Sequence, residues 1–288
     1  MIDLHIHTSY SSDGQYTPAE IISLAKKCGL AALAFSDHMD ITAAAEGMGS
    51  AAAADIEFFT GVELSTTLEG TEYHLLCYGF DPGNLAVQEF IRHHCALAWA
   101  NVESILDYFR GLGFLLNADE VSGWGKSVPT GVTMLRALVK GNPDDARLLR
   151  YTRGDRSDSP YLNFYQDFSL SAFGKTFSSA FPCLKDTIHE MKGHGVLVLA
   201  HPGRINGDLL RLLKGYGLQG VEVHSTHHTP ETVLYAAGLA RSLGLFASAG
   251  SDFHGEKIKP DIPLGKVSGK PDDALIEAVR HSMAVWRG

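Results

Sequence analysis

Short apolar runs alternate with helical patterns along most of this chain, and that alternation limits the possible folds more than any other feature. Residues 31–36 (AALAFS) and 196–200 (VLVLA) are continuous apolar runs, as expected for parallel strands buried on both faces. Between such runs apolar residues recur with helical spacing, for example after Pro18, where Gly29 is expected to end a helix. Repeated strand–helix units predict an α/β fold with a parallel sheet, either doubly wound or closed into a barrel.

The pattern covers both ends of the chain and stops in the middle. Residues 113–181 hold clustered polar residues and an aromatic tract, Tyr161–Phe168, which could stack on a base but more commonly packs a small core. We interpret residues 113–181 as an inserted cap subdomain of helices and loops, and residues 1–112 and 182–288 as the main domain. We expect strands at residues 2–7, 31–36, 57–63, 73–80, 196–200, 220–224 and 245–250, and helices from Pro18 and at residues 43–54, 85–112, 184–193, 209–215, 231–243 and 272–283.

Composition excludes several classes of protein. Apolar residues make up 45% and charged residues 20% of the 288 residues, so the chain can bury a large core and is not disordered. No apolar run approaches the roughly 20 residues that span a bilayer, and the first residues show no secretory signal. The net charge of −9 makes a nucleic acid polymer an unexpected partner, because its phosphates need a basic surface.

The four cysteines are widely spaced and form no CxxC motif. This spacing excludes a zinc finger or a disulfide framework and predicts a cytoplasmic protein with reduced thiols. Histidine is the unusual residue, with 14 in the chain.

Many of the histidines and several carboxylates fall where strands are expected to end. His5 and His7 lie at i and i+2 of the first strand and so point to the same face. Sites in α/β folds are built at the carboxyl ends of the strands. The residues that share this placement, or lie in the loops that follow, are His5, His7, Asp13, His38, Glu63, His74, His201, Asp252 and His254.

These nine residues suit metal binding. Imidazole nitrogens bind Zn, Mn, Fe and Co, and carboxylates bridge ions. Nine ligands exceed the four to six that one ion takes, so we predict two to three divalent ions (Mn, Fe or Zn). The set lacks cysteine, which argues against a structural zinc. Histidines in helical or connecting stretches, such as His93 and His281, carry no such prediction.

The motifs that hold these residues resemble the polymerase and histidinol phosphatase (PHP) family. The resemblance rests on DLHIHT with SSDG (residues 3–8 and 11–14), SDH (36–38), GVELS (61–65), YHLL (73–76), AHPG (200–203) and GSDFH (250–254). It implies a distorted (β/α)7 barrel resembling a TIM barrel, formed by residues 1–112 and 182–288. It also implies a first ion at His5, His7, Glu63 and Asp252, a second at Glu63, His74 and His201, and a third at Asp13, His38 and His254.

The family also implies a metal-dependent hydrolase of phosphate esters. The length and the insertion resemble its small-molecule branch, so we expect a small phosphorylated sugar or nucleotide as substrate. The leading candidates are a phosphoribosyl cyclic phosphate diester, which a phosphodiesterase would open, and a nucleoside 3′,5′-bisphosphate. We expect a hydroxide that bridges two ions to attack phosphorus.

Other residues are candidates for binding the substrate or moving a proton. We expect Glu63 and Asp252 to act in catalysis as ligands, and His228 to protonate the leaving oxygen. Candidate substrate contacts are Arg204, His228, Lys175, Arg136 and His224. Three alternatives stay open: a histidinol-phosphate phosphatase, a metal hydrolase of amides or lactones, and a metal-bearing binding module without turnover. The oligomeric state is not predicted.

Overall fold

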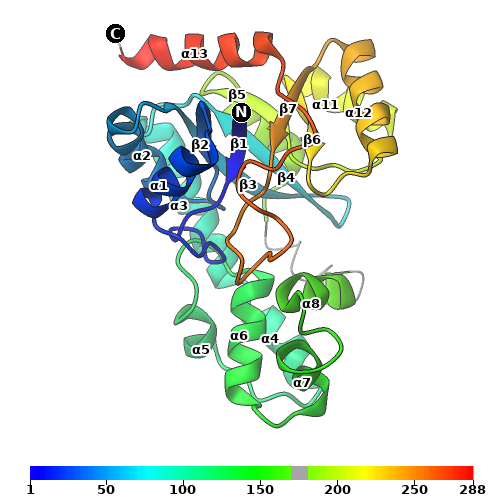
Figure 1. Cartoon of the computed structure of the whole chain (residues 1–288). Coiled ribbons are helices and arrows are strands. Elements are labelled where there is room, and N and C mark those ends of the chain that lie inside the picture. Colours follow the sequence, from blue (N-terminus) through cyan, green and yellow to red (C-terminus); the bar gives the residue numbers. More distant parts are fainter. Residues whose placement is uncertain (170–180, 288) are drawn as a thin grey trace.

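The computed structural model describes residues 1–169 and 181–287. Seven strands form one sheet in the order β1-β2-β3-β4-β5-β6-β7, and helices cover its outside (Figure 1). The strands are β1 (Ile2–Ile6), β2 (Ala32–Phe35), β3 (Glu57–Leu68), β4 (Thr71–Tyr78), β5 (Val196–Leu199), β6 (Gly220–Ser225) and β7 (Phe246–Gly250).

The sheet closes on itself beyond the last strand. The backbone amide of His7 donates to the carbonyl of Phe253 at 2.8 Å, and the amide of Asp252 donates to the carbonyl of His5 at 2.8 Å. A parallel bridge joins Ile6 to Phe253. The predicted barrel-like α/β fold is therefore confirmed, and of the two arrangements that the strand pattern allowed the chain adopts the closed one.

One strand departs from the predicted parallel order. β4 runs antiparallel to both of its neighbours, β3 and β5. Residues 69–70 between β3 and β4 leave room only for a hairpin, and both residues have positive φ (52° at Glu69 and 78° at Gly70). A parallel connection needs a crossover of about a dozen residues or more, so this short link reverses the chain.

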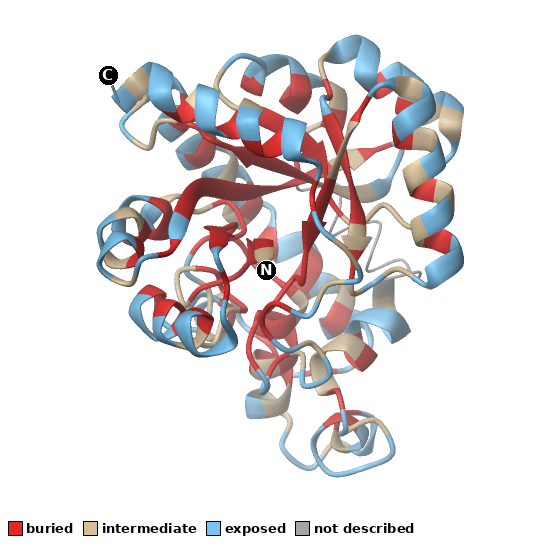
Figure 2. Cartoon of the chain, turned by 45° about the horizontal axis from the view of Figure 1, so that its top comes forward, coloured by how far each residue is buried: buried red, intermediate tan, exposed pale blue. Residues whose placement is uncertain are grey.

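The helices around the barrel begin and end as the sequence indicates. α1 (Pro18–Cys28) has a capping box between Thr17 and Glu20 and ends at Gly29, whose φ is 72°. The others outside the insertion are α2 (Thr42–Ala53), α3 (Leu85–Ala100), α10 (Leu184–Met191), α11 (Gly207–Tyr216), α12 (Pro230–Leu243) and α13 (Asp273–Arg287). In Figure 2 the strands are buried, and the helices expose only their outer faces.

The long helix expected over residues 85–112 is two helices. Asn101 ends α3 and begins α4 (Val102–Gly111), and its side-chain amide donates to the carbonyl of Leu97 at 2.9 Å. α4 lies below the barrel with α5 (Ala118–Ser122), α6 (Gly131–Gly141), α7 (Ala146–Thr152) and α8 (Pro160–Ser169), as Figure 1 shows. The division at residues 112 and 182 stays a prediction.

The aromatic tract of the insertion serves two purposes. Phe164 is fully buried and packs against Phe109 and Tyr151, with ring centroids 6.1 and 5.6 Å away. Tyr161 and Tyr165, from the same helix, instead line a cavity beneath the barrel. The tract therefore joins the large hydrophobic core on one face and forms a cavity wall on the other.

Candidate metal centre

Eight of the nine predicted ligands form groups whose ligand atoms lie within 4.8 Å of one another. Among the described residues there are three such groups: His5, His7, Glu63 and Asp252; His7, Asp13, His38 and His254; and His38, Glu63 and His74. The ninth residue, His201, joins them through a 3.1 Å contact between its Nε2 and Oε1 of Glu63. The structure thus brings together the whole set, from segments up to 249 residues apart.

Glu63 lies at the centre of the cluster and is fully buried. Its Oε1 faces His74 Nδ1 at 2.9 Å and His201 Nε2 at 3.1 Å. Its Oε2 faces the other side, 3.2 Å from His5 Nε2 and 3.1 Å from both His7 Nε2 and His38 Nδ1. Each carboxylate oxygen therefore serves a different set of imidazoles, the arrangement that a bridging ligand needs.

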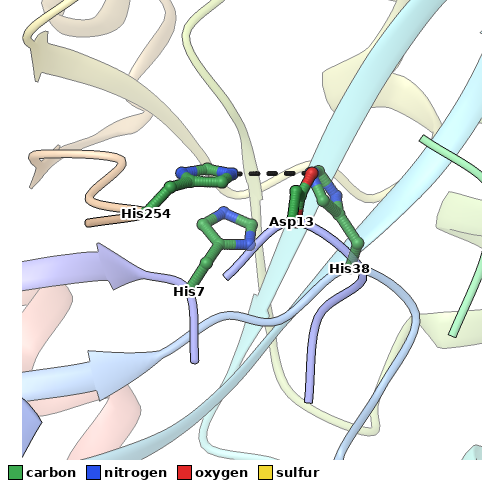
Figure 3. A group of neighbouring side chains, drawn as sticks. All are labelled: His7, Asp13, His38 and His254. Carbon is green, nitrogen blue, oxygen red and sulfur yellow. Dashed lines mark ion pairs between the residues drawn. The ribbon is translucent and has the colours of Figure 1, made fainter. Parts of the chain in front are cut away.

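The second group stands on three separate segments (Figure 3). Asp13 lies in the loop after β1, His38 follows β2, and His254 follows β7. Asp13 Oδ2 is 3.5 Å from His38 Nε2 and 3.7 Å from His254 Nε2. These distances exceed ordinary hydrogen bonds, which leaves room for a cation between the three side chains.

Several buried ligand atoms lack a hydrogen-bond partner. They are Nε2 of His5, both ring nitrogens of His7, Nδ1 of His38 and Oε2 of Glu63. A buried polar atom without a partner costs about 1–3 kcal/mol, and this chain concentrates five such atoms in one place. Bound cations would satisfy them, so the donor set fits a metal centre.

The electrostatics favour cation binding as well. Burial alone would raise the pKa of the Glu63 carboxyl, but the charges of His5 and His74 hold that pKa well below its ordinary range. Burial lowers the pKa of His38 to about 3 and that of His254 to about 4. Near neutral pH both imidazoles are therefore uncharged, with a lone pair free for a metal ion.

Two of the candidate ligands have strained backbone. Asp252 has a φ of 58° and His201 a φ of 24°, in the left-handed region that favours glycine. Such conformations persist only where the surrounding structure enforces them. At Asp252 that enforcement comes from the barrel-closing hydrogen bonds beside it.

Glu222 was not predicted, although it holds two of the ligands in place. It is fully buried in β6, its Oε1 is 3.1 Å from His5 Nδ1, and its Oε2 accepts from the amide of His201 at 2.9 Å. A carboxylate behind a ligating imidazole orients the ring. The available signal was an acidic residue inside the otherwise apolar run 220–223 (GVEV).

Replacing Glu222 with glutamine is expected to weaken metal binding by about 10–100-fold. Glutamine has an oxygen at only one of the two carboxylate positions, and its nitrogen at the other position cannot accept a hydrogen bond. Either the ring of His5 or the amide of His201 would therefore lose its partner. Titration against a competing chelator measures the affinity, and Glu190→Gln, on the exposed side of α10, is the control. Unchanged affinity in a folded Glu222→Gln protein would show that Glu222 does not act through the ligands.

Two buried aspartates position the loops of the centre. Asp3 accepts hydrogen bonds from the amide and hydroxyl of Ser251 at 2.9 and 2.6 Å. Asp37 accepts from the amide and hydroxyl of Thr8 at 2.6 and 2.7 Å and from the amide of Ser11 at 3.2 Å. Asp37 therefore secures the loop that carries Asp13.

The centre opens into a cavity of about 260 Å³. Seven of the nine candidate ligands line it, together with apolar and aromatic side chains of the insertion: Val128, Pro129, Val132, Tyr161, Leu162 and Tyr165. A second hollow of about 370 Å³ shares Glu72, His74, Tyr165 and His201 with the first. The two hollows together could hold a small substrate beside the metal ligands.

The structure places His228 and His224 outside the cavity lining, and their roles toward a substrate stay predictions. Nδ1 of His228 donates to the carbonyl of Val223 at 2.9 Å, and Nε2 accepts from the amide of Gly203 at 3.1 Å. Both ring nitrogens of His228 are thus held by backbone. His224 contacts Ser268 at 3.3 Å, and neither histidine lines the cavity. The neighbour His227 lines it instead, with Nε2 2.6 Å from Asp252 Oδ2.

The arginines and the lysine predicted to contact the substrate do not lie together in the structure. Arg204 lines the second hollow and stacks over Tyr235 with its guanidinium carbon 5.1 Å from the ring centroid. Arg136 lies between Trp124 and Tyr161, 5.5 Å from each centroid, and does not line the cavity. The role of Arg136 as a substrate contact stays a prediction. Lys175 lies outside the described residues.

A family model described as the PHP domain matches residues 3–117. The resemblance seen in the sequence motifs is thereby confirmed. The chain is also similar over most of its length to a solved structure from Bifidobacterium adolescentis, described as a candidate metal-dependent phosphoesterase. The TM-score is 0.75 at 23% identity, over 98% of this chain and 96% of that one.

Curated relatives match most of the chain. A 5′-3′ exoribonuclease of Haemophilus influenzae is 29% identical over 88% of this chain and 89% of its own length. A 3′,5′-nucleoside bisphosphate phosphatase of Chromobacterium violaceum is 29% identical, over 88% and 87%. A phosphoribosyl 1,2-cyclic phosphate 1,2-diphosphodiesterase of Eggerthella lenta is 26% identical, over 88% and 94%.

Two further expectations concern location. None of the helices in residues 1–169 and 181–287 is both long and apolar enough to cross a bilayer. All four cysteines are free thiols in the structure.

Proposed function

We propose that this chain hydrolyses phosphate esters of a small sugar or nucleotide at a centre of two to three divalent ions (Mn, Fe or Zn). Two relatives, a nucleoside bisphosphate phosphatase and a phosphoribosyl cyclic phosphate diphosphodiesterase, support a hydrolase that acts on phosphate esters. The alternatives of an amide or lactone hydrolase and a histidinol-phosphate phosphatase are not favoured. The observation that carries the proposal is the buried Glu63, whose two oxygens face different imidazoles.

The geometry supports the predicted distribution of ligands. Oε2 of Glu63, His5, His7 and Asp252 would hold a first ion, and Oε1 with His74 and His201 a second. Asp13, His38 and His254 would hold a third. Divalent ions bound there would act as Lewis acids toward the phosphoryl group and lower the pKa of water.

The chain's own residues would bind and enclose the substrate. Tyr165 Oη is 3.4 Å from Glu72 Oε2, and Glu72 Oε1 is 3.0 Å from His74 Nε2. This chain of contacts connects the insertion to the metal ligands at the cavity mouth. The apolar wall of the insertion would exclude water from the reacting phosphate, and His227 is positioned to protonate the leaving oxygen.

The second hollow bears on the substrate class. Arg204 lines it, beside the His74 and His201 side chains that also line the first cavity. An arginine at that place suits a second anionic group, as in a nucleoside 3′,5′-bisphosphate. The relatives include exoribonucleases, so a 5′-phosphorylated RNA end is a further outcome to test. Location in the cytoplasm stays a prediction.

Turnover of a substrate panel tests the proposal. The panel holds adenosine 3′,5′-bisphosphate, ribose 1,2-cyclic phosphate 5-phosphate, histidinol phosphate, a short 5′-phosphorylated RNA, an amide and a lactone. We expect the metal-loaded protein to release phosphate from the first or open the cyclic ester of the second, and a chelator to abolish turnover. A metal-loaded protein that cleaves no phosphate ester would contradict the proposal, and preference for the RNA would reassign its substrate.

A further inference from the structure

Lys259 is the sole lysine or arginine among the described residues that line the metal-site cavity. It lies on the loop after β7, five residues beyond His254. Its side chain is 19% exposed, and its Nζ is 2.5 Å from Asp252 Oδ2. Nothing in the sequence distinguished Lys259 from the other lysines of that loop.

The contact with Asp252 does not by itself account for this lysine. Asp252 Oδ2 already has a partner in His227 Nε2 at 2.6 Å, and Oδ1 faces His7 Nε2 at 3.2 Å. Withdrawing an ammonium group from water costs free energy. Lys257, on the same loop, avoids this cost because its side chain is exposed to water. The half-buried position of Lys259 is therefore better explained if a second, anionic partner binds in the cavity.

The charges around the cavity identify the kind of partner. The carboxylates of Asp13, Glu63, Glu72 and Asp252 line it. A phosphate ester that enters would meet this negative charge, and Glu72 is not among the candidate metal ligands that would be neutralised. Arg136 and Arg204 do not line this cavity. Within residues 1–169 and 181–287, Lys259 is thus the basic side chain at the place where phosphate would lie.

We propose that Lys259 binds a non-bridging oxygen of the substrate's phosphoryl group. This inference rests on the proposed function and adds to it a residue that determines affinity for the phosphate. Lysine binds phosphate as a compact point charge with three donors, so the position of its charge matters more than a planar geometry. An arginine there should keep part of the function, and a neutral side chain should lose it.

The test uses the metal-loaded, full-length protein and inorganic phosphate as the probe. Calorimetry measures phosphate affinity for wild type, Lys259→Gln, Lys259→Arg and the control Lys257→Gln. We expect Lys259→Gln to bind phosphate about 10–100-fold more weakly, because a hydrogen bond to a charged group is worth about 1.5–3 kcal/mol. Lys259→Arg should lose less, and Lys257→Gln should match wild type.

Two parallel measurements separate substrate binding from other roles. Elemental analysis should find the same metal content in Lys259→Gln as in wild type, and KM for the best ester of the panel should rise more than kcat falls. Equal phosphate affinity in Lys259→Gln and wild type, or a loss of metal in step with the loss of affinity, would overturn the inference. If phosphate binding depends on Lys259 but no ester is cleaved, the inference stands and the proposed function fails.

Discussion

Replacing Glu63 with glutamine should abolish phosphate ester hydrolysis and remove two metal ions together. A neutral amide supplies one oxygen and one nitrogen that carries hydrogens, so it cannot bridge between the His5–His7 side and the His74–His201 side. A metal ion contributes several kcal/mol of transition-state stabilisation, so the rate should fall by about 10³-fold or more. Elemental analysis and steady-state turnover of the best panel substrate measure the two effects.

The matched control is Glu57→Gln, on the same strand β3. Glu57 is exposed and paired with Arg280 at 2.6 Å, far from the cluster along the strand, so metal content and turnover should match wild type. Loss of a single ion from Glu63→Gln, with the other retained, would contradict the bridging assignment. If Glu63→Gln keeps its full metal content but loses turnover, Glu63 takes part in the reaction without being needed to bind the ions.

Replacing Gly250 with alanine should destabilise the fold by about 3 kcal/mol, at the upper end of typical overpacking effects. Gly250 ends β7 where the barrel closes against β1. A Cβ there would lie 2.2 Å from His5 Cβ and 2.7 Å from Glu222 Oε1. Neither atom can move away without displacing a candidate metal ligand. Urea denaturation of the metal-free protein measures the change in the free energy of unfolding.

The control for that experiment is Gly238→Ala in helix α12, where an added Cβ meets no atom within 4 Å. Alanine inside a helix is about 0.5–1 kcal/mol more favourable than glycine, so this variant should be slightly more stable than wild type. If Gly250→Ala unfolds at the same urea concentration as wild type, β1 and β7 do not pack as closely as the structure has them.

The candidate ligands could be predicted from the sequence because they depend on local rules. Alternation along a strand places His5 and His7 on one face, and the carboxyl ends of successive parallel strands meet at one end of a barrel. Residues that follow different strands, such as His38 and Asp252, therefore converge without any knowledge of the loops. The same rules located the helix from Pro18 to Gly29, because its end signals are local.

Residues in loops could not be predicted with the same success. The choice between His227 and His228 depends on which of two adjacent side chains faces inward. Lys259 and Lys257 differ in the same way, and their loop has no periodic pattern. Which neighbour enters the cavity is decided by backbone hydrogen bonds, such as the one from the amide of Gly203 to His228.

The sequence by itself determined the α/β class, the apolar strands and the set of nine metal-binding candidates, because each follows from short-range periodicity and residue chemistry. Tertiary structure alone decided that the sheet closes, that β4 is reversed, and that Glu222 lies behind His5, 217 residues away in the chain. It also placed Lys259 rather than Arg136 in the cavity. The physical reason is that these features depend on contacts between distant segments, whose geometry is fixed only when the barrel closes.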